Sequence, residues 1–496
     1  MPIRITAKTP RTGTRPCRLY PLLKGQLSKG NGSLLAGLPA GVRKTAQALA
    51  ALRGFEADAE QTLLLFEDGV QWLLAGLGPE DELTPHGFST AVGRGLNELT
   101  KAGAGQIALH LPEGLPFEPA QAARLATEGL AMAAYTFDVY RKPKANGAAP
   151  VGVVIKGPGG EAALRRGVDE GLAVAAGIGL CRDLINHPAG VAHPGFMVAE
   201  ARKLAKQMGA TARVIQGEQL RRQGYEAIHA VGAAAAHPPA LVALEYGKPR
   251  KGKPTLVLVG KGVTFDSGGL DLKPSSAMAL MKKDMGGAAT TLGAFRAVAG
   301  LKLPLHLVAV VGLAENAVGP LAYRPGDVLR TKAGPTVEVT NTDAEGRIVL
   351  ADAMALAHTY APTHMIDFAT LTGACRIALG KDVMGLFCDD APLRALLQDA
   401  AEASGDALWP LPLWQPYRKQ LNSAVADMVN ATTGGFGGAI TAALFLQEFA
   451  GDVAWAHLDC YAWSDGEHPL FPKGGNGVGV RLIADVATRL SKGTQP

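Results

Sequence analysis

Short apolar segments alternate with alanine-rich segments between residues 255 and 370, and this alternation restricts the fold more than any other feature. The runs at 255–259, 305–311 and 364–370 have the length and composition of buried strands. The segments 286–300 and 344–361 have the composition of helices. Strands that alternate with helices favour a mainly parallel sheet with helices on both faces. We therefore expect an α/β fold for this part of the chain.

The length of the chain predicts more than one domain. It has 496 residues, of which 47% are hydrophobic, so it can bury more than one large core. Residues 1–160 mix strand-like and helical stretches, which predicts a small N-terminal α/β domain. The segment 140–150 has the composition of a linker, but 151–155 reads as one more strand, so we place the boundary near residue 160. A long alanine-rich helix over 161–186 then opens a larger C-terminal domain, residues 161–496.

Cysteine and histidine usage excludes several kinds of site. The five cysteines form no CxxC pair and are odd in number, which indicates a reducing compartment rather than a disulfide framework. No HExxH motif occurs, so we expect no histidine-ligated zinc, and we expect His457 to be structural. Residues 1–30 lack the apolar core of a signal peptide, and the longest apolar run, near 171–181, is too short to span a membrane. These features predict a cytoplasmic protein that does not associate with membranes.

The heptad NTDAEGR at 341–347 is the most informative chemical motif. It places the carboxylates of Asp343 and Glu345 two positions apart, with Arg347 close behind. Crowded carboxylates need a compensating charge, and a divalent metal with oxygen ligands can supply it. The ordinary alternative is a capping box from Thr342 to Glu345, with Arg347 paired to Asp343 along the first helical turn. For the heptad alone, the alternative is preferable.

A second cluster upstream favours the metal site over the capping box. It follows the strand-like run at 255–259 and contains Lys261 and Asp266, the pair Gly268-Gly269, and Asp284 before a helical segment. Each of these residues has an ordinary explanation when taken singly: a turn former, a helix cap, or a solvated lysine such as Lys282 or Lys283. Taken together, the clusters supply four carboxylates and several lysines in glycine-rich loops after apolar strands. That combination favours a two-metal hydrolytic site.

At these residues the chain resembles the leucine aminopeptidase family of cytosolic di-metal exopeptidases. The resemblance covers roughly residues 180–460, and both clusters look like signatures of the family. Further similar stretches are 182–186 (RDLIN), 323–327 (YRPGD), 369–374 (ATLTGA), 437–443 (GGAITAA) and 455–459 (WAHLD). The resemblance implies a linker helix between two domains, a metallopeptidase C-terminal domain and a homohexamer.

The resemblance also implies a ligand set for two divalent ions, Mn²⁺ or Zn²⁺. One ion would be held by Lys261, Asp266, Asp284 and Glu345, and the other by Asp266, Asp343 and Glu345. A lysine amine binds a metal only when neutral, which requires that its pKa be lowered by the adjacent dication.

Further roles follow from the same resemblance. Lys273 would polarise the scissile carbonyl and stabilise the oxyanion, and Arg347 would anchor bicarbonate as the general base. The substrate would lie against Met281, Thr370, Leu371 and Gly373. The implied activity is removal of the N-terminal residue of peptides, with leucine and other apolar residues preferred. Ala279, at a position where many members have aspartate, and the segment after Asp459 depart from the family pattern and indicate a subgroup.

The charge of the N-terminal segment leaves a second class of function open. Residues 1–54 contain ten Lys or Arg and no acidic residue, although the whole chain carries only +5. A nucleic-acid-binding face would have this composition, and so would an organellar presequence. We prefer an ordinary basic face of a small domain. The alternative function is therefore a DNA-binding accessory or regulatory protein on the same scaffold, which would not need the complete ligand set.

Overall fold

The computed structural model describes residues 3–7, 17–27, 38–142 and 151–493. The chain forms two compact units, one from Met1–Ala175 with Asp465–Lys473 and one from Ala176–Ser464 with Gly474–Pro496. The division falls inside helix α4 (Gly160–Asn186), which matches the long helix expected over 161–186. The domain boundary near residue 160 stays a prediction. Most of the linker-like segment, residues 143–150, lies outside the described residues.

The first unit contains a six-stranded sheet in the order β1-β6-β5-β2-β4-β3. All neighbouring strands are parallel except β3 and β4, so the expected small α/β domain is confirmed. Helices α2 and α3 bury one set of apolar side chains against the sheet, and α1 buries another. The elements are β1 (Ile3–Thr6), β2 (Cys17–Leu22), α1 (Ala40–Arg53), β3 (Thr62–Glu67), β4 (Val70–Gly76), η1 (Glu80–Glu82), α2 (Pro85–Lys101), β5 (Gln106–His110), α3 (Pro119–Ala133) and β6 (Val151–Lys156).

The basic N-terminal segment is partly matched by nearby acids. Lys24 lies 2.8 Å from Asp58 and 3.3 Å from Glu56, and Arg18 lies over the ring of Trp72. Four of the ten basic residues, at positions 8, 11, 15 and 29, lie outside the described residues. The described part therefore agrees with an ordinary basic face.

The second unit contains an eight-stranded sheet in the order β15-β14-β17-β13-β9-β10-β8-β7. Its centre, from β17 to β10, is parallel, and antiparallel pairs flank the centre on both sides, so the mainly parallel sheet is confirmed. The strands are β7 (Thr211–Gln216), β8 (Ala240–Tyr246), β9 (Thr255–Asp266), β10 (His306–Asn316), β13 (His364–Ala369), β14 (Met384–Phe387), β15 (Leu408–Pro410) and β17 (Ala454–Asp459). Short strands complete the unit: β11 (Val328–Arg330), β12 (Thr336–Glu338), β16 (Met428–Val429), β18 (Trp463–Ser464) and β19 (Gly474–Gly475).

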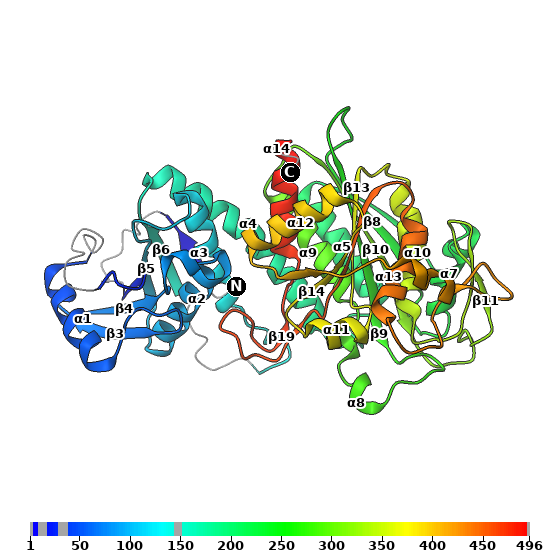
Figure 1. Ribbon diagram of the computed structural model, residues 1–496, viewed down its shortest axis with the longest axis horizontal. Helices are drawn as coiled ribbons and strands as arrows, with labels where there is room; N and C mark the ends of the chain where they lie inside the picture. The colour runs from blue at the N-terminus through cyan, green and yellow to red at the C-terminus, as the bar shows by residue number, and fades with distance from the viewer. Residues whose placement is uncertain (1–2, 8–16, 28–37, 143–150, 494–496) are drawn as a thin grey trace. The chain divides into compact units, whose positions relative to one another are not determined.

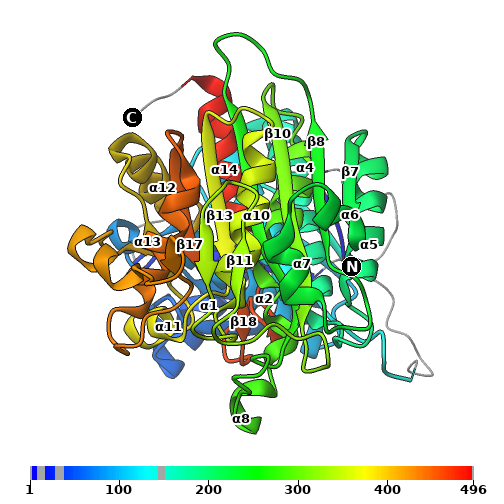
Figure 2. The same ribbon diagram turned by 90° about the vertical axis from the view of Figure 1, so that its right-hand side faces the viewer.

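Helices cover both faces of this sheet, as Figures 1 and 2 show. Helices α5, α9, α12 and α14 lie on one face, and α7, α10 and α13 lie on the other. Their bounds are α5 (Pro194–Met208), α6 (Glu218–Arg222), α7 (Glu226–Gly232), α8 (Ser275–Met278), η2 (Met281–Lys283), α9 (Gly286–Gly300), α10 (Glu345–His358), α11 (Gly373–Leu379), α12 (Ala391–Ser404), η3 (Gln415–Leu421), α13 (Gly438–Ala450) and α14 (Val480–Lys492). No helix among the described ranges is long and apolar enough to cross a membrane.

One expectation about the second cluster, which contains Lys261 and Asp266, is wrong. The glycines after residue 259 suggested a loop, but β9 continues to Asp266, so Lys261 lies within a strand. Gly260 is needed there because a Cβ would lie 2.7 Å from the Cα of Ala288 in α9. The glycine therefore permits close packing of a helix on the strand rather than a turn.

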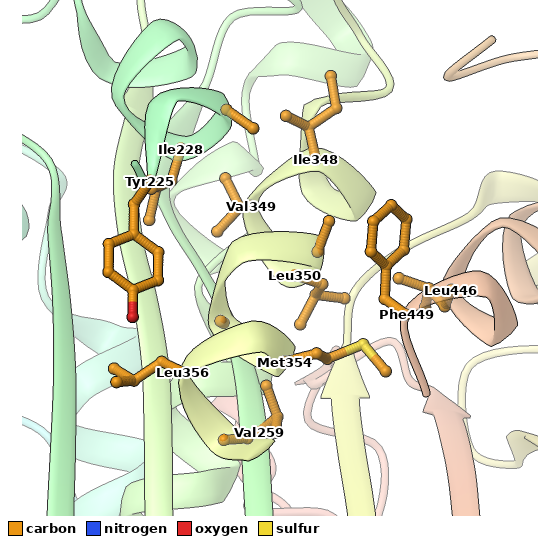
Figure 3. Packing of buried hydrophobic residues seen from close by; sticks show 14 of the residues in the cluster. Tyr225, Ile228, Val259, Ile348, Val349, Leu350, Met354, Leu356, Leu446 and Phe449 are labelled. Carbon is orange, nitrogen blue, oxygen red and sulfur yellow. The ribbon is translucent and has the colours of Figure 1, made fainter. Parts of the chain in front are cut away.

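Helix α10 is held firmly in the core, and this fixes the position of the heptad at its start. Figure 3 shows Ile348, Val349, Leu350 and Met354 of α10 among buried side chains from α7, β9 and α13. Each fully buried side chain of this size contributes roughly 1.5–3 kcal/mol. The first turn of α10 is thus anchored by the turns that follow it.

Candidate metal centre

Three parallel strands of the second unit end at one cavity of about 580 Å³. Asp266 is the last residue of β9, Thr370 follows β13, and Asp459 is the last residue of β17. The carboxyl ends of parallel strands are where α/β proteins commonly bind ligands. All eleven residues singled out from the sequence line this cavity: Lys261, Asp266, Lys273, Met281, Asp284, Asp343, Glu345, Arg347, Thr370, Leu371 and Gly373.

The ammonium of Lys261 lies between two buried carboxylates. Its Nζ is 2.8 Å from Asp284 Oδ2 and 2.9 Å from Glu345 Oε1, and it donates to the carbonyl of Thr370 at 3.0 Å. Burial opposes the charge on Lys261, but the surrounding carboxylates outweigh burial and raise its pKa well above the usual range. Gly346 makes the arrangement sterically feasible, because a Cβ there would lie 2.5 Å from Lys261 Cε.

Lys273 bridges the other two carboxylates. Its Nζ lies 2.9 Å from Asp266 Oδ2 and forms a second ion pair with Asp343. Burial opposes the charge here too, but Asp266 and Asp343 raise the pKa of Lys273 above its usual value. Asp266 Oδ1 accepts hydrogen bonds from the backbone N–H of Gly268 and from Asn316 Nδ2, both at 2.9 Å. The two lysines therefore act as counterions for the four carboxylates.

The carboxylates fit a divalent cation. Asp266, Asp343 and Glu345 each offer an oxygen, and these oxygens lie within 4.8 Å of one another. Burial, together with the charge on Asp266, raises the pKa of Glu345 to about 8 and that of Asp343 to about 6. Glu345 Oε2 is buried and has no hydrogen-bond partner among the described residues. A buried acceptor without a donor, in a set of hard oxygen ligands, is what a divalent metal ion would complete.

The capping interpretation of the heptad is wrong. Helix α10 begins at Glu345, and no side chain caps its N-terminus. The hydroxyl of Thr342 instead donates to the carbonyl of Gly268 at 2.6 Å and accepts from the backbone N–H of Asp271 at 2.8 Å. It thus ties the two clusters to each other. Asp284 is likewise not a cap of α9, because its Oδ1 accepts from the hydroxyl of Thr370 at 2.8 Å.

Arg347 does not pair with Asp343 along the helix. It is 8% exposed, lines the cavity, and donates from one terminal nitrogen to the carbonyl of Asn430 at 2.8 Å. Its Nε has no hydrogen-bond partner within the described part of the chain. Burial lowers the pKa of Arg347 to about 10, although Glu345 opposes this shift. A buried guanidinium with donors to spare is suited to hold an anion.

Asp459 positions the backbone that lines the cavity, a role that the sequence did not reveal. Its Oδ1 accepts from the backbone N–H groups of Leu371 and Thr372 at 3.0 and 3.3 Å, and its Oδ2 accepts from the Thr372 hydroxyl at 2.6 Å. The stretch 455–459 indicated only a family similarity. His457 has no part in this positioning, because it is fully buried and bonded to Asp367 at 2.6 Å, as expected for a structural residue.

Asn316 and Asn430 were also missed, because nothing around them in the sequence marks them as special. Asn316 ends β10 and donates to both Asp266 and the carbonyl of Thr342. Asn430 accepts from the backbone N–H of Thr340 at 2.8 Å and donates to the carbonyl of Asn341 at 2.6 Å. Both side chains orient the segments that carry the carboxylates.

Comparison with known proteins agrees with this geometry. The model of the cytosol aminopeptidase family, catalytic domain, matches residues 179–484, and that of the N-terminal domain of the same family matches residues 24–144. A probable cytosol aminopeptidase of Syntrophotalea carbinolica is 42% identical over 86% of this chain and 88% of its own length. One from Roseiflexus castenholzii is 43% identical over 86% of this chain and 89% of its own length.

Solved structures give the same result. The bottromycin maturation enzyme BotP in complex with Mn is similar with a TM-score of 0.85 and 37% identity, over 96% of this chain and 99% of that one. Cytosol aminopeptidase from Coxiella burnetii has a TM-score of 0.82 and 35% identity, over 98% and 99%. None of these matches supports the DNA-binding alternative. This chain therefore belongs to the cytosol aminopeptidase family, whose members are metal-dependent aminopeptidases.

Proposed function

We propose that this chain releases the N-terminal residue of peptides through a centre of two divalent metal ions, with leucine and other apolar residues preferred. The observation that carries the proposal is the convergence of three carboxylates from two sequence clusters, with a buried oxygen of Glu345 left without a donor. Membership of the family and the likeness to a Mn complex of BotP support it further.

The proposed ligands are the residues already assigned from the sequence. One ion would be held by Lys261, Asp266, Asp284 and Glu345, and the second by Asp266, Asp343 and Glu345. When bound, two divalent ions would polarise a carbonyl and lower the pKa of a water between them. Mn²⁺ and Zn²⁺ both suit such a site. Lys261 would have to give up its proton on binding, since only the neutral amine has a free lone pair.

Lys273 and Arg347 are the proposed catalytic residues. Lys273 is partly open to the cavity and keeps its proton because Asp266 and Asp343 raise its pKa against the effect of burial. A protonated amine can stabilise the oxyanion that develops on the scissile carbonyl. The unpaired donor of Arg347 would hold bicarbonate, which would act as the general base.

The remaining wall would receive the substrate. Met281 and Leu371 supply apolar surface, and Thr370 and Gly373 border the same cavity. Apolar contacts of this kind favour leucine as the first residue. A free N-terminal amine would be required, because a blocked amine has no lone pair for a metal and needs more space.

We further propose that the enzyme is a homohexamer in the cytoplasm, with a domain boundary near residue 160. Family membership supports the assembly, and the five cysteines, all free in the structure, suit a reducing compartment. Sedimentation equilibrium would test the assembly: a mass other than six chains would contradict it. Limited proteolysis would test the boundary.

Chelation followed by reconstitution tests the mechanism. Removing metal should abolish hydrolysis of leucine p-nitroanilide, and Mn²⁺ or Zn²⁺ should restore it with two ions bound per chain. Asp343→Asn should lower the stoichiometry and the rate, because an amide is a weaker ligand than a carboxylate. Asp452→Asn removes an exposed carboxylate outside the cavity and is the matched control. Full activity after exhaustive chelation would refute the proposed mechanism.

A further inference from the structure

Lys283 is a buried cation that forms no ion pair within the part of the chain that the structure describes. The sequence suggested an ordinary solvated lysine, but the side chain is only 5% exposed and lines the cavity next to Asp284. Among the described residues, no carboxylate oxygen lies within 4.0 Å of its ammonium. Its close contact is the ring of Tyr461, whose centroid is 4.3 Å from Nζ. A cation–π contact offsets only part of the desolvation of an ammonium.

A second cation faces the same ring. The guanidinium carbon of Arg376 lies 4.6 Å from the Tyr461 centroid, and Arg376 also lines the cavity. Within the described ranges, Arg376 likewise has no carboxylate within ion-pair distance. Two like charges beside one ring repel each other, and this repulsion is relieved by an anion placed between them.

The nearby carboxylates are not available as that anion. Asp284 is engaged by Lys261 at 2.8 Å and by the hydroxyl of Thr370 at 2.8 Å. Asp459 accepts hydrogen bonds from two backbone N–H groups and from the Thr372 hydroxyl. Lys283 therefore borders the cavity without a carboxylate in ion-pair distance among the described residues, and an anionic group of a ligand would supply that partner.

We propose that Lys283 and Arg376, which both contact the ring of Tyr461, form a subsite that binds a carboxylate of the peptide substrate. The carboxylate would belong either to the side chain of an acidic first residue or to the C-terminus of a dipeptide. The inference rests on the proposed peptidase function and deepens it, because it adds a charged substrate class to the apolar one. Tyr461 would pack against the methylene groups that precede the carboxylate.

Isosteric substrate pairs test the subsite. Glutamate and glutamine p-nitroanilides have the same shape and differ in one charge, and so do the dipeptide Leu-Gly and its C-terminal amide. The subsite should favour the charged member of at least one pair by roughly ten- to a hundredfold in kcat/KM, as expected for a charge-assisted hydrogen bond in a desolvated site. Preference within the first pair assigns the side chain, and preference within the second assigns the C-terminus. Discrimination in neither pair overturns the proposal.

Variants then assign the preference to these residues. Lys283→Gln should reduce the preference for the charged member to about threefold or less, and Lys283→Arg should restore most of it. Lys282→Gln is the matched control, because Lys282 is the adjacent lysine but donates to the carbonyl of Asn186 at 2.8 Å and does not line the cavity. A preference that survives in Lys283→Gln overturns the proposal. Arg376→Gln, at an exposed position, gives the same readout if Lys283→Gln does not fold.

A binding measurement separates this inference from the proposed function. Free glutamate and glutamine can be titrated calorimetrically into the metal-loaded protein, with leucine as a third ligand. Tighter binding of glutamate than of glutamine, lost in Lys283→Gln, supports the subsite even in a protein that hydrolyses no peptide. Equal affinities exclude the side chain of an acidic first residue, and equal kcat/KM values for Leu-Gly and its amide then exclude the C-terminus as well and overturn the subsite. Hydrolysis of leucine p-nitroanilide remains a separate test of the peptidase.

Discussion

A single methyl group at Gly346 should disable the proposed metal centre by displacing the side chain of Lys261. Gly346 is the second residue of α10, and a Cβ there would lie 2.5–2.7 Å from the Cδ, Cε and Nζ atoms of Lys261. Ordinary contacts between such atoms are about 3.5–4.0 Å. The Lys261 side chain must therefore move by about 1 Å, because α10 is anchored by its buried face.

The displacement breaks interactions whose size can be estimated. Lys261 would lose one or two of its three contacts, to Asp284 at 2.8 Å, Glu345 at 2.9 Å and the Thr370 carbonyl at 3.0 Å. Hydrogen bonds to charged groups contribute about 1.5–3 kcal/mol each, so the site loses roughly 3 kcal/mol. Alanine is favoured over glycine in a helix by up to about 1 kcal/mol. The net result is a modest loss of global stability and a large loss of function, because a misplacement of about 1 Å can lower a rate by about 10²-fold.

The assay combines metal titration, activity and thermal unfolding. Gly346→Ala should bind Mn²⁺ roughly 10- to 100-fold more weakly and should hydrolyse leucine p-nitroanilide about 100-fold more slowly. Gly179→Ala is the control: it is also a helical glycine, in α4, but a Cβ there meets nothing within 4 Å. The control should keep wild-type metal binding and melt at the same or a slightly higher temperature.

A double-mutant cycle shows whether the effect passes through Lys261. In a Lys261→Ala background, the added methyl group has space, so Gly346→Ala should change metal affinity by less than about threefold. If Gly346→Ala alone keeps two ions at wild-type affinity and full activity, the reasoning about Lys261 is refuted. Additive losses in the double mutant would show instead that the methyl group disturbs the start of α10.

Three other properties of the chain should have measurable consequences. Since burial raises the pKa of Glu345 to about 8, metal binding below that pH must expel a proton, and the affinity for Mn²⁺ should rise at least about tenfold per pH unit from pH 6 to pH 7. Calorimetry in buffers of different ionisation enthalpy would detect the released proton, and an affinity that does not depend on pH would contradict this expectation. Asp459→Ala should free the backbone of Leu371 and lower kcat/KM about tenfold while metal content stays constant, as elemental analysis can check. Burial also raises the pKa of Asp352 to about 7, so the native state keeps a proton that the unfolded chain releases near pH 4. The stability that this proton contributes is full below about pH 4 and is lost, by roughly 4 kcal/mol, as the pH rises through about 7. In Asp352→Asn, the free energy of unfolding measured with urea should vary less with pH across that window.

The parallel strands and the helices beside the site could be predicted because each is indicated by the composition of its own short segment. The apolar runs that became β9, β10 and β13 and the helices α9 and α10 all lie where their composition indicated. The reading of Gly260 as part of a loop failed because the sequence does not show what packs against it, and only the structure reveals α9 at 2.7 Å. A glycine in a sequence can be required by a turn or by a closely packed neighbour. The sequence alone does not show which of the two requires the glycine.

The supporting residues were missed for a related reason. Asn316, Asn430 and Asp459 act through hydrogen bonds to segments 26–90 residues away in the chain. Such hydrogen bonds depend on which strand ends lie next to each other in the folded chain. The type of a single residue does not reveal this arrangement. The capping interpretation of Thr342 failed in the same way, since its hydroxyl serves Gly268 and Asp271 about 70 residues upstream instead of its own helix.

The lysines of the site explain how four carboxylates, three of them buried, can be assembled before any metal is present. Lys261 joins Asp284 to Glu345, and Lys273 joins Asp266 to Asp343, so each carboxylate has a cationic partner in the folded chain. Breaking a buried ion pair costs about 3–5 kcal/mol, so these pairs hold the proposed ligands close together in the folded chain. Burial, together with the negative charge of Asp266, nevertheless raises the pKa of Glu345 to about 8. Metal uptake at the proposed ligands would then exchange protons for cations at Lys261 and Glu345, and the same charges that would bind the metal already hold these side chains together in the folded chain.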